Sequence, residues 1–297
     1  MVLHSRPTTA GPGLPVAGRR CQTRPVPDEG AYVLGHSAAE LRRLETQATV
    51  VDPVTRRFMI EAGIGRGMRV LDVGSGAGDV AMLVGDLVGP AGEVVGFDRS
   101  AAALDVARER TTARSLGHVR YVTGAIDEVD LDGPFDAVVG RYVLQFQPDP
   151  AVMLAAVAAH VRPGGLVLFH ELDWSGVASD PPAPTYERVR GWLQAAIERS
   201  GASVHMGLAL PGVFARAGLG DPEVRLEQRL GAGESADEVL ERITHLAVTL
   251  EPRLAELQIV SPEELAISTL FQRMRDEVVA NRSLVRSHLQ VGAWTRV

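Results

Sequence analysis

Residues 70–80 read VLDVGSGAGDV, a short apolar run that is followed by three glycines in five positions. The run predicts a buried strand, and the residues after Gly78 predict the start of a helix. Glycines let the backbone turn sharply between the two elements and approach a ligand without interference from a Cβ atom. The helix that follows presents unpaired backbone N–H groups at the same point. This strand–loop–helix unit therefore predicts a sheet with a ligand site at one edge.

The same alternation of strand and helix continues as far as Trp174. Strands of this kind joined by helices indicate βαβ units and a parallel sheet. We therefore expect an α/β protein with a doubly wound, Rossmann-like, mostly parallel seven-stranded sheet, N-terminal helices and a helical lid or insertion. Its ligand site should lie at the carboxyl ends of the strands, near the topological switch point. The strands are predicted over 68–73, 93–97, 119–122, 135–140, 166–169, 224–230 and 289–297.

Capping signals place the surrounding helices. Ser37 with Glu40, Ser235 with Glu238 and Ser261 with Glu264 each have the spacing of a capping box. Asp52-Pro53 and Asp149-Pro150 each have the pattern of an N-cap residue followed by proline at the first helical position. From these signals we divide the chain into a flexible tail (1–28), an N-terminal helical cap (29–66), a core (67–175) and lid helices that also complete the sheet (176–297).

Composition excludes several classes of function. All 30 basic residues are arginine, so a lysine Schiff base or lysine nucleophile is excluded. The net charge of −7 argues against nucleic acid as a partner. No apolar stretch reaches the length of a membrane span, so we expect no membrane partner. The single cysteine, Cys21, allows no disulfide or cysteine zinc site within one chain, which fits a cytoplasmic protein with no metal.

An acidic residue is expected to lie beside the glycine loop. Asp98 ends the second predicted strand, twenty residues after Gly78, where a carboxylate can accept both hydroxyl hydrogens of a ribose. Dinucleotide folds prefer the spacing G-x-G-x-x-G, whereas this loop has G-x-G-x-G and is followed by Asp79. An acid at that position would repel a pyrophosphate. The pattern therefore favours a nucleoside cofactor that carries no phosphate.

The stretch from Asp72 to Gly78 resembles the first motif of class I S-adenosylmethionine-dependent methyltransferases. Residues 95–100, 135–141 and 162–165 resemble, in the same order, that family's ribose-binding strand end, fourth strand and the turn before its fifth strand. Residues 32–37 and 141–144 are more closely similar to a bacterial small-molecule subgroup related to ubiquinone and menaquinone biosynthesis methyltransferases. That subgroup includes many natural-product tailoring enzymes.

The resemblance implies S-adenosylmethionine as the cofactor. The sequence departs from the family at Ala125, a position at which an acid usually bonds the adenine amino group. Either Asp127 substitutes for that acid, or Ile126 and the backbone alone contact the adenine. Arg43 and Gln47 can reach the cofactor carboxylate or form a solvated face, and Tyr32 can pack on the cofactor or on the core. The expected cofactor-binding residues are Tyr32, Arg43, Gln47, Asp72, Gly74, Ser75, Gly76, Gly78, Asp98, Arg99, Ala125, Ile126, Arg141 and Tyr142.

Methyl transfer needs alignment and a dry site, and a general base when the acceptor is a hydroxyl or an acidic carbon. The candidate catalytic bases are His170, His36 and His205. For His170 the alternative is a wall residue, and for His36 a local contact at the helix entry. His170 and Glu171 point to opposite faces of a strand, which argues against shared metal ligation. The remaining histidines are interpreted as surface residues.

The acceptor pocket is expected beyond the fourth and fifth strands. Phe146 stands where the subgroup often has a histidine, which suggests a more apolar pocket. The expected substrate-binding residues are Phe146, Asp173, Trp174 and Tyr186. The helices that follow form a lid, a homodimer surface, or both.

These features predict a methyltransferase that transfers the sulfonium methyl group to O, N or C of a small apolar or aromatic molecule of the natural-product type. A nicotinamide-dependent oxidoreductase is one alternative, which the identity of the cofactor distinguishes. A non-methylating cyclase that binds S-adenosylmethionine is another, which the product distinguishes.

Overall fold

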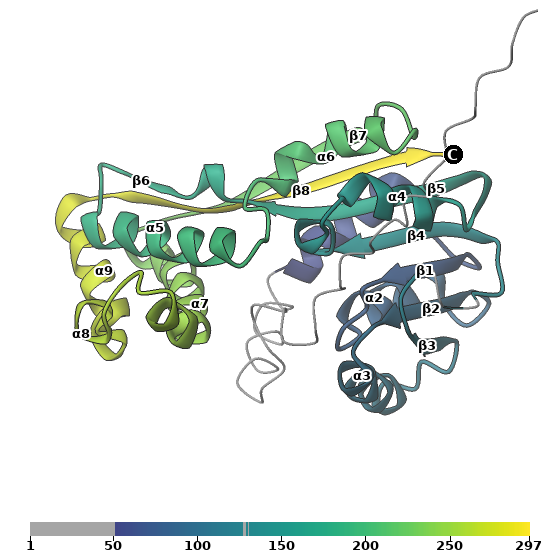
Figure 1. Ribbon diagram of the computed structural model, residues 1–297, viewed down its shortest axis with the longest axis horizontal. Helices are drawn as coiled ribbons and strands as arrows, with labels where there is room; N and C mark the ends of the chain where they lie inside the picture. Colours follow the sequence, from purple (N-terminus) through teal and green to yellow (C-terminus); the bar gives the residue numbers. More distant parts are fainter. Residues whose placement is uncertain (1–50, 127–128, 130) are drawn as a thin grey trace, which may run out of the picture.

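A twisted sheet of eight strands runs the length of the molecule in the computed structural model, which describes residues 51–126, 129 and 131–297 (Figure 1). The strand order is β3-β2-β1-β4-β5-β8-β6, and β7 pairs with β8. The strands are β1 (Arg69–Val73), β2 (Glu93–Asp98), β3 (Val119–Thr123), β4 (Phe135–Arg141), β5 (Val161–Asp173), β6 (Ala178–Asp180), β7 (Glu223–Ala232) and β8 (Leu284–Arg296). The Rossmann-like, mostly parallel sheet is confirmed, and the three-residue β6 brings the count above the seven predicted.

Strands β1 to β5 are parallel to one another, as the helical crossovers require. The Ser100 side chain caps the second crossover helix by accepting from Ala103 N, and Asp149 caps the third. The order reverses between β1 and β4, so the carboxyl ends of these two strands form the crevice in which α/β sheets bind ligands. The crossover helices are α2 (Asp79–Val88), α3 (Ala101–Ala113) and α4 (Pro150–Ala158).

Helices cover both faces of this sheet. On one face, residues 51–62 form a helix that packs with α2 against β1, β4 and β5, around Phe58 and Met59. On the other face, α4 and α6 (Met206–Arg216) bury Leu154, Leu210 and Phe214. The layers therefore follow from the apolar side chains that alternate on the two sides of each strand.

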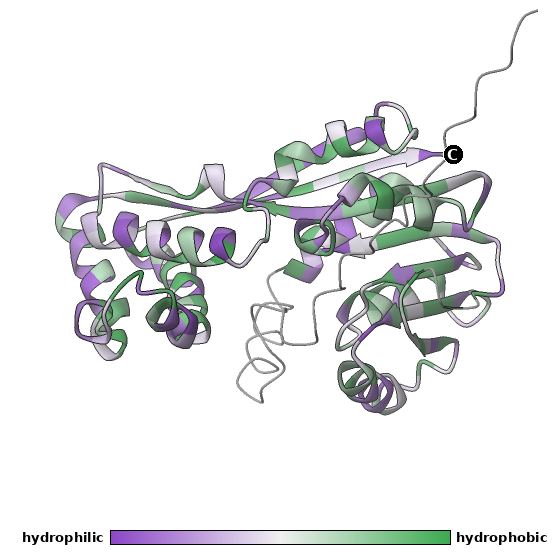
Figure 2. Cartoon of the chain, viewed as in Figure 1, coloured by the Kyte–Doolittle hydropathy of each residue, from purple (hydrophilic) through white to green (hydrophobic). Residues whose placement is uncertain are grey.

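A separate group of helices packs at the far end of β8, away from β1 (Figure 1). Its core brings together Leu193, Ile243 and Met274. Figure 2 shows hydrophilic and hydrophobic residues alternating along the helices of this group. The group consists of α5 (Pro184–Arg199), α7 (Asp237–Glu256), α8 (Pro262–Leu265) and α9 (Ile267–Asn281).

Two predicted helix starts are wrong. The helix that contains Asp52 already includes Val51, so Asp52 is not its N-cap; its carboxylate pairs with Arg141 instead. Ser235 does not cap α7, because its hydroxyl bonds the backbone N–H and carbonyl of Ala232 in the preceding turn. Both residues have side chains suited to capping, but tertiary and turn contacts use them differently.

Gly292 of β8 allows Phe58 to pack directly on the sheet, since a Cβ there would lie 2.6 Å from Phe58 Cδ2. Gly292→Ala should therefore lower the free energy of unfolding by about 1–3 kcal/mol through overpacking. A Cβ at Gly191 in α5 would meet no atom within 4 Å, so Gly191→Ala should be neutral or stabilising by about 0.5–1 kcal/mol. Urea denaturation of both variants measures the two effects; equal effects would contradict this packing.

Candidate active site

The glycine loop after β1 adopts a conformation that side chains would disturb. Gly74, Gly76 and Gly78 have φ angles of 64°, 51° and 86°. A Cβ on Gly74 would lie 2.8 Å from Val143 Cγ2, and one on Gly78 would lie 2.6 Å from the Tyr121 hydroxyl. A Cβ on Gly76 would meet nothing within 4 Å. The loop is therefore packed at its two ends and open in its middle.

Asp98 holds this loop from the end of β2. Its Oδ2 accepts a hydrogen bond of 2.9 Å from Gly76 N, and its Oδ1 accepts one of 2.9 Å from Ser100 N. The two bonds fix the carboxylate between the loop and the start of α3. Arg99, the next residue, is exposed.

Asp72 lies beneath the loop rather than at its surface. It is 1 % exposed, and Ser75 Oγ donates to its Oδ2 at 2.7 Å. Burial raises the pKa of Asp72 to about 7, against the opposing effect of the Ser75 hydrogen bond. Asp72 and Ser75 are therefore placed to support the loop from below.

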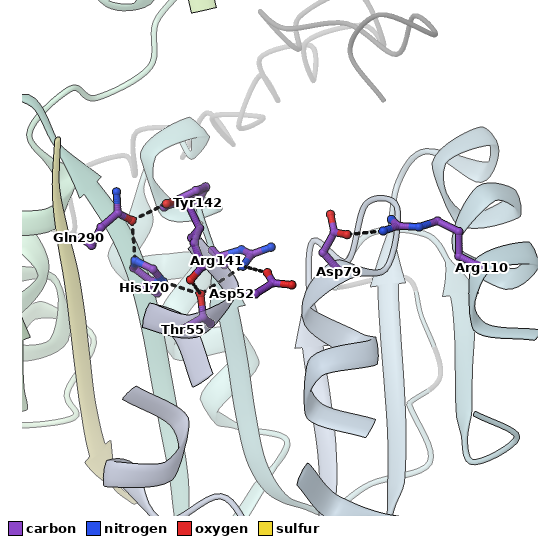
Figure 3. A network of polar contacts seen from close by, with 9 residues as sticks. Asp52, Thr55, Asp79, Arg110, Arg141, Tyr142, His170 and Gln290 are labelled. Carbon is purple, nitrogen blue, oxygen red and sulfur yellow. Dashed lines mark hydrogen bonds and ion pairs between the residues drawn. The ribbon is translucent and has the colours of Figure 1, made fainter. Parts of the chain in front are cut away.

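The acid at the start of α2 is neutralised by its neighbour. Arg110 of α3 forms an ion pair of 2.6 Å with Asp79 and also donates to Ala77 O at 2.7 Å (Figure 3). The expected repulsion between Asp79 and a pyrophosphate is thus weaker than the sequence alone predicts. The G-x-G-x-G spacing remains as the sequence argument against a dinucleotide.

A network of polar side chains lies near the carboxyl ends of β4 and β5 (Figure 3). Arg141 donates to Asp52 Oδ1 at 2.7 Å and to Thr55 Oγ1 at 3.1 Å. Thr55 Oγ1 lies 3.0 Å from His170 Nδ1. The network therefore joins the helix over 51–62 to the ends of two strands.

The same network continues to β8. His170 Nε2 lies 2.9 Å from Gln290 Oε1, and the Tyr142 hydroxyl donates to that same oxygen. Burial and the neighbouring Arg141 charge lower the pKa of His170 to about 3, so its ring is neutral at physiological pH. Tyr142 adopts a left-handed conformation with φ of 58° and donates its N–H to His170 O at 2.9 Å.

The three predicted catalytic histidines differ in what the structure shows of their surroundings. His170 is fully buried and both ring nitrogens have partners, so its placement favours positioning over proton transfer. His205 precedes α6 with a side chain that is 54 % exposed, and its Nδ1 lies 3.4 Å from Asp173 Oδ1. His36 lies outside the described residues.

Several other predicted residues also lie outside the described part of the chain, namely Tyr32, Arg43, Gln47 and Asp127. The capping box of Ser37 and Glu40 lies there as well. Of the expected adenine contacts, Ala125 accepts a backbone hydrogen bond from Val129 at 3.1 Å and Ile126 packs against the core. The Gly124 N–H bonds Asp98 O at 2.9 Å, which places this segment beside the end of β2.

Two of the expected substrate-binding residues, Tyr186 and Trp174, fill the hydrophobic core instead. Tyr186 is fully buried in the core of the helical group, and its hydroxyl donates to Arg286 O at 2.7 Å. Trp174 is buried and packs edge-on against His288, with ring centroids 4.2 Å apart. The interpretation of His288 as a surface residue is therefore also wrong. Apolar faces of this kind are more often core than pocket.

Asp173 and Phe146 lie at two different turns. Asp173 is buried and accepts from Ser175 N at 2.9 Å and from Leu208 N at 3.0 Å, so its carboxylate is used in ordering the chain between β5 and α6. Phe146 is half-buried in a single 3₁₀ turn after β4.

Glu171 is a buried acid that was not among the predicted site residues. Its Oε1 accepts from Val143 N at 2.9 Å and from Leu144 N at 2.7 Å, which fixes the turn after β4. Burial raises its pKa to about 8, so the carboxyl is neutral near pH 7. Strand alternation places Glu171 and His170 on opposite faces, as expected, but the sequence gives no sign of this acceptor role.

No group of three or more His, Cys, Asp or Glu side chains gathers at a metal site within the described residues. Among the described helices, none combines the length and apolar character that a bilayer span needs.

Comparison with known proteins shows what the core is similar to. Residues 64–208, just under half of the chain, match the family model of a methyltransferase domain. This segment is therefore similar to methyltransferase domains. The match supports S-adenosylmethionine as its cofactor. The matched residues begin just before β1 and end in α6, so they contain the glycine loop, Asp98 and the network at the ends of β4 and β5.

The chain is also 33 % identical, over 135 residues, to demethylmenaquinone methyltransferase of Staphylococcus aureus. That match covers 45 % of this chain and 53 % of the relative, so the chain spans about half the length of the curated relatives it matches.

Two solved structures share the fold. A putative methyltransferase from Bacillus halodurans aligns with a TM-score of 0.52 and 20 % identity, over 81 % of this chain and 98 % of that one. The YcgJ protein from Bacillus subtilis aligns with a TM-score of 0.51 and 17 % identity, over 82 % and 98 % of the two chains.

The raised pKa of Glu171 gives a pH-dependent stability. The folded protein holds this proton up to about pH 8, whereas the unfolded chain releases it near 4.5. The carboxyl therefore contributes stability that is present at low pH and is lost as the pH rises through this window. As the pH rises through this window, the free energy of unfolding of the wild type should fall relative to that of Glu171→Gln. The fall should be up to about 1.4 kcal/mol per pH unit.

Equilibrium denaturation at several pH values between about 5 and 8 measures this difference. Glu198→Gln, at an exposed position of α5, is the matched control and should follow the wild type. Parallel stability curves for Glu171→Gln and the wild type would contradict the burial argument.

Proposed function

We propose that the chain is a methyltransferase that transfers the methyl group of S-adenosylmethionine to O, N or C of a small, partly apolar molecule. The observation that carries the proposal is the glycine loop tied to Asp98 at the end of β2, within a segment that matches a methyltransferase domain. The Staphylococcus aureus relative is a demethylmenaquinone methyltransferase, which supports a small organic acceptor. The net charge of −7 argues against a nucleic acid substrate.

The residues present fit this cofactor. The open face of Gly76 leaves room for a ligand against the loop backbone. Each Asp98 oxygen accepts one backbone hydrogen bond and keeps a further lone pair, so the carboxylate can still accept from ribose hydroxyls. The charge of Arg110 is taken up by Asp79, so this arginine is not free to hold a phosphate. The proposed binding residues are Asp98 and the loop from Gly74 to Gly78, with Asp72 and Ser75 supporting them.

When bound, S-adenosylmethionine supplies an electrophilic methyl group that the electron pair of an acceptor displaces in line from sulfur. The chain then has to hold the acceptor in line and exclude water, and such positioning can lower a barrier by about 7–11 kcal/mol. Arg141 and Tyr142 are the residues proposed to border the reacting groups, because they stand at the end of β4 beside the switch point. The Asp52–Thr55–His170 contacts hold them in place.

Asp98→Asn tests the cofactor site. The substitution keeps the shape of the side chain but removes its charge and replaces one acceptor oxygen by a donor. We expect binding of S-adenosylmethionine and S-adenosylhomocysteine to weaken by about tenfold or more, because a hydrogen bond to a charged group contributes roughly 1.5–3 kcal/mol. Calorimetric titration of the full chain measures the change, with NAD as the competing ligand class.

Asp105→Asn is the matched control, since Asp105 is an exposed acid on α3 that pairs only with Arg108 within the described residues. It should bind both ligands like the wild type. Binding of NAD alone would contradict the proposal and favour an oxidoreductase. Unchanged binding of S-adenosylmethionine by Asp98→Asn would contradict the role of Asp98.

A further inference from the structure

A cleft of about 450 Å³ lies between the helix over 51–62, β7, α7 and β8. It is the meeting point of the methyltransferase core and the helical group, because β8 continues from one to the other. Val51, Pro53 and Val54 give it one apolar wall. The volume lies within the range of small-molecule sites.

The charges of the described side chains that line the cleft do not sum to zero. Arg57 forms a two-bonded ion pair with Glu227, and Arg229 pairs with Glu238. Arg242 of α7 is the third arginine of the lining, and no hydrogen bond or ion pair to it exists within the described residues. One positive charge is therefore left over, in a protein whose net charge is −7.

A buried donor at the cleft also lacks a partner in the described part of the chain. Gln290 of β8 lines the cleft and is 5 % exposed. Its Oε1 takes the bonds from Tyr142 and His170, while its Nε2 has no hydrogen-bond partner among the described residues. A buried amide without a partner costs roughly 1–3 kcal/mol, so an unpaired donor at the wall of a cleft indicates a ligand oxygen.

Gln290 connects this cleft to the reacting edge of the core. The same amide that faces the cleft accepts the hydroxyl proton of Tyr142, the residue that follows β4. The Arg242 charge reaches the same tyrosine, where it opposes the effect of burial, which raises the pKa of Tyr142 to about 12. Gln290 of β8 thus contacts the residue that follows β4, and Arg242 of α7 lines the same cleft as Gln290.

We propose that this cleft binds the anionic end of the methyl acceptor, a small carboxylic acid with an apolar body. The carboxylate pairs with Arg242, an acceptor oxygen receives the Gln290 Nε2 proton, and the apolar body lies against Val51 and Val54. A guanidinium suits a carboxylate because its N–H groups match the two oxygens. This inference rests on the proposed function for the identity of the ligand as the acceptor, but the binding itself can be tested separately.

The test uses 2-naphthoate and octanoate as probes, titrated into the full chain by calorimetry. The neutral 2-naphthamide and octanamide are the matched ligands without charge. We expect both acids to bind and each amide to bind at least about tenfold more weakly. Arg242→Gln should weaken the acids by at least about tenfold and leave the amides unchanged.

Arg253→Gln is the control variant, because Arg253 stands on the same helix but pairs with Glu256 and Ser200 outside the cleft. It should bind all four probes like the wild type. A second variant, Gln290→Glu, keeps an oxygen for Tyr142 and replaces the free donor by a negative charge, so it should abolish binding of the acids. Titration with S-adenosylmethionine in every variant shows that the core remains folded.

Failure of the acids to bind, or equal affinity of Arg242→Gln and the wild type for them, would overturn the inference about the cleft. If S-adenosylmethionine binds in those same samples, the proposed function survives. If the acids bind as expected and S-adenosylmethionine does not, the cleft stands as an anion site and the proposed function fails.

Discussion

The pairing of β8 with three other strands is the constraint on which the rest of the structure depends. Its thirteen residues run antiparallel to β5, β6 and β7, so one strand joins the methyltransferase core to the helical group. Gln290 faces Leu172 of β5 on one side and Glu227 of β7 on the other. This register brings Gln290 beside His170 and Tyr142, which precede it by 120 and 148 positions in the chain. Backbone pairing therefore places the side chains that border the proposed acceptor cleft.

Burial favours the uncharged state of several polar side chains in the proposed site. His170 is uncharged because burial and Arg141 both disfavour its protonation, and Asp72 and Glu171 hold protons more tightly because they are buried. Arg141 keeps its charge, and Asp52 balances it at 2.7 Å. A methyl transfer from a cationic donor benefits from such fixed, dry surroundings, since they need no rearrangement when charge moves. The contacts of Arg141 connect the end of β4 with the helix over 51–62, and the contact of Asp72 with Ser75 supports the glycine loop.

The sequence predicted the sheet because alternation and glycine spacing are local signals. The loop, Asp98 and the caps at Ser100 and Asp149 could all be read from neighbouring residues. The contacts of Asp52, Glu171 and Gln290 could not, because each depends on a partner from a distant element. The expectation that Trp174 and Tyr186 bind substrate failed for a related reason, because both have the same sequence pattern whether they line a pocket or fill a core. The packing of α5 against α7 and β8 decides between the two.

Hydrogen–deuterium exchange of the full chain, with and without S-adenosylhomocysteine, tests the central claim most directly. The claim is that one edge, made by the loop after β1, the end of β2 and the turn after β4, holds the cofactor. Binding should slow the exchange of backbone amides in residues 74–80, 98–101 and 141–146, while β3 and the outer surface of α9 remain unchanged. Protection confined to the helical group, or absent from the glycine loop at saturating ligand, would contradict the account.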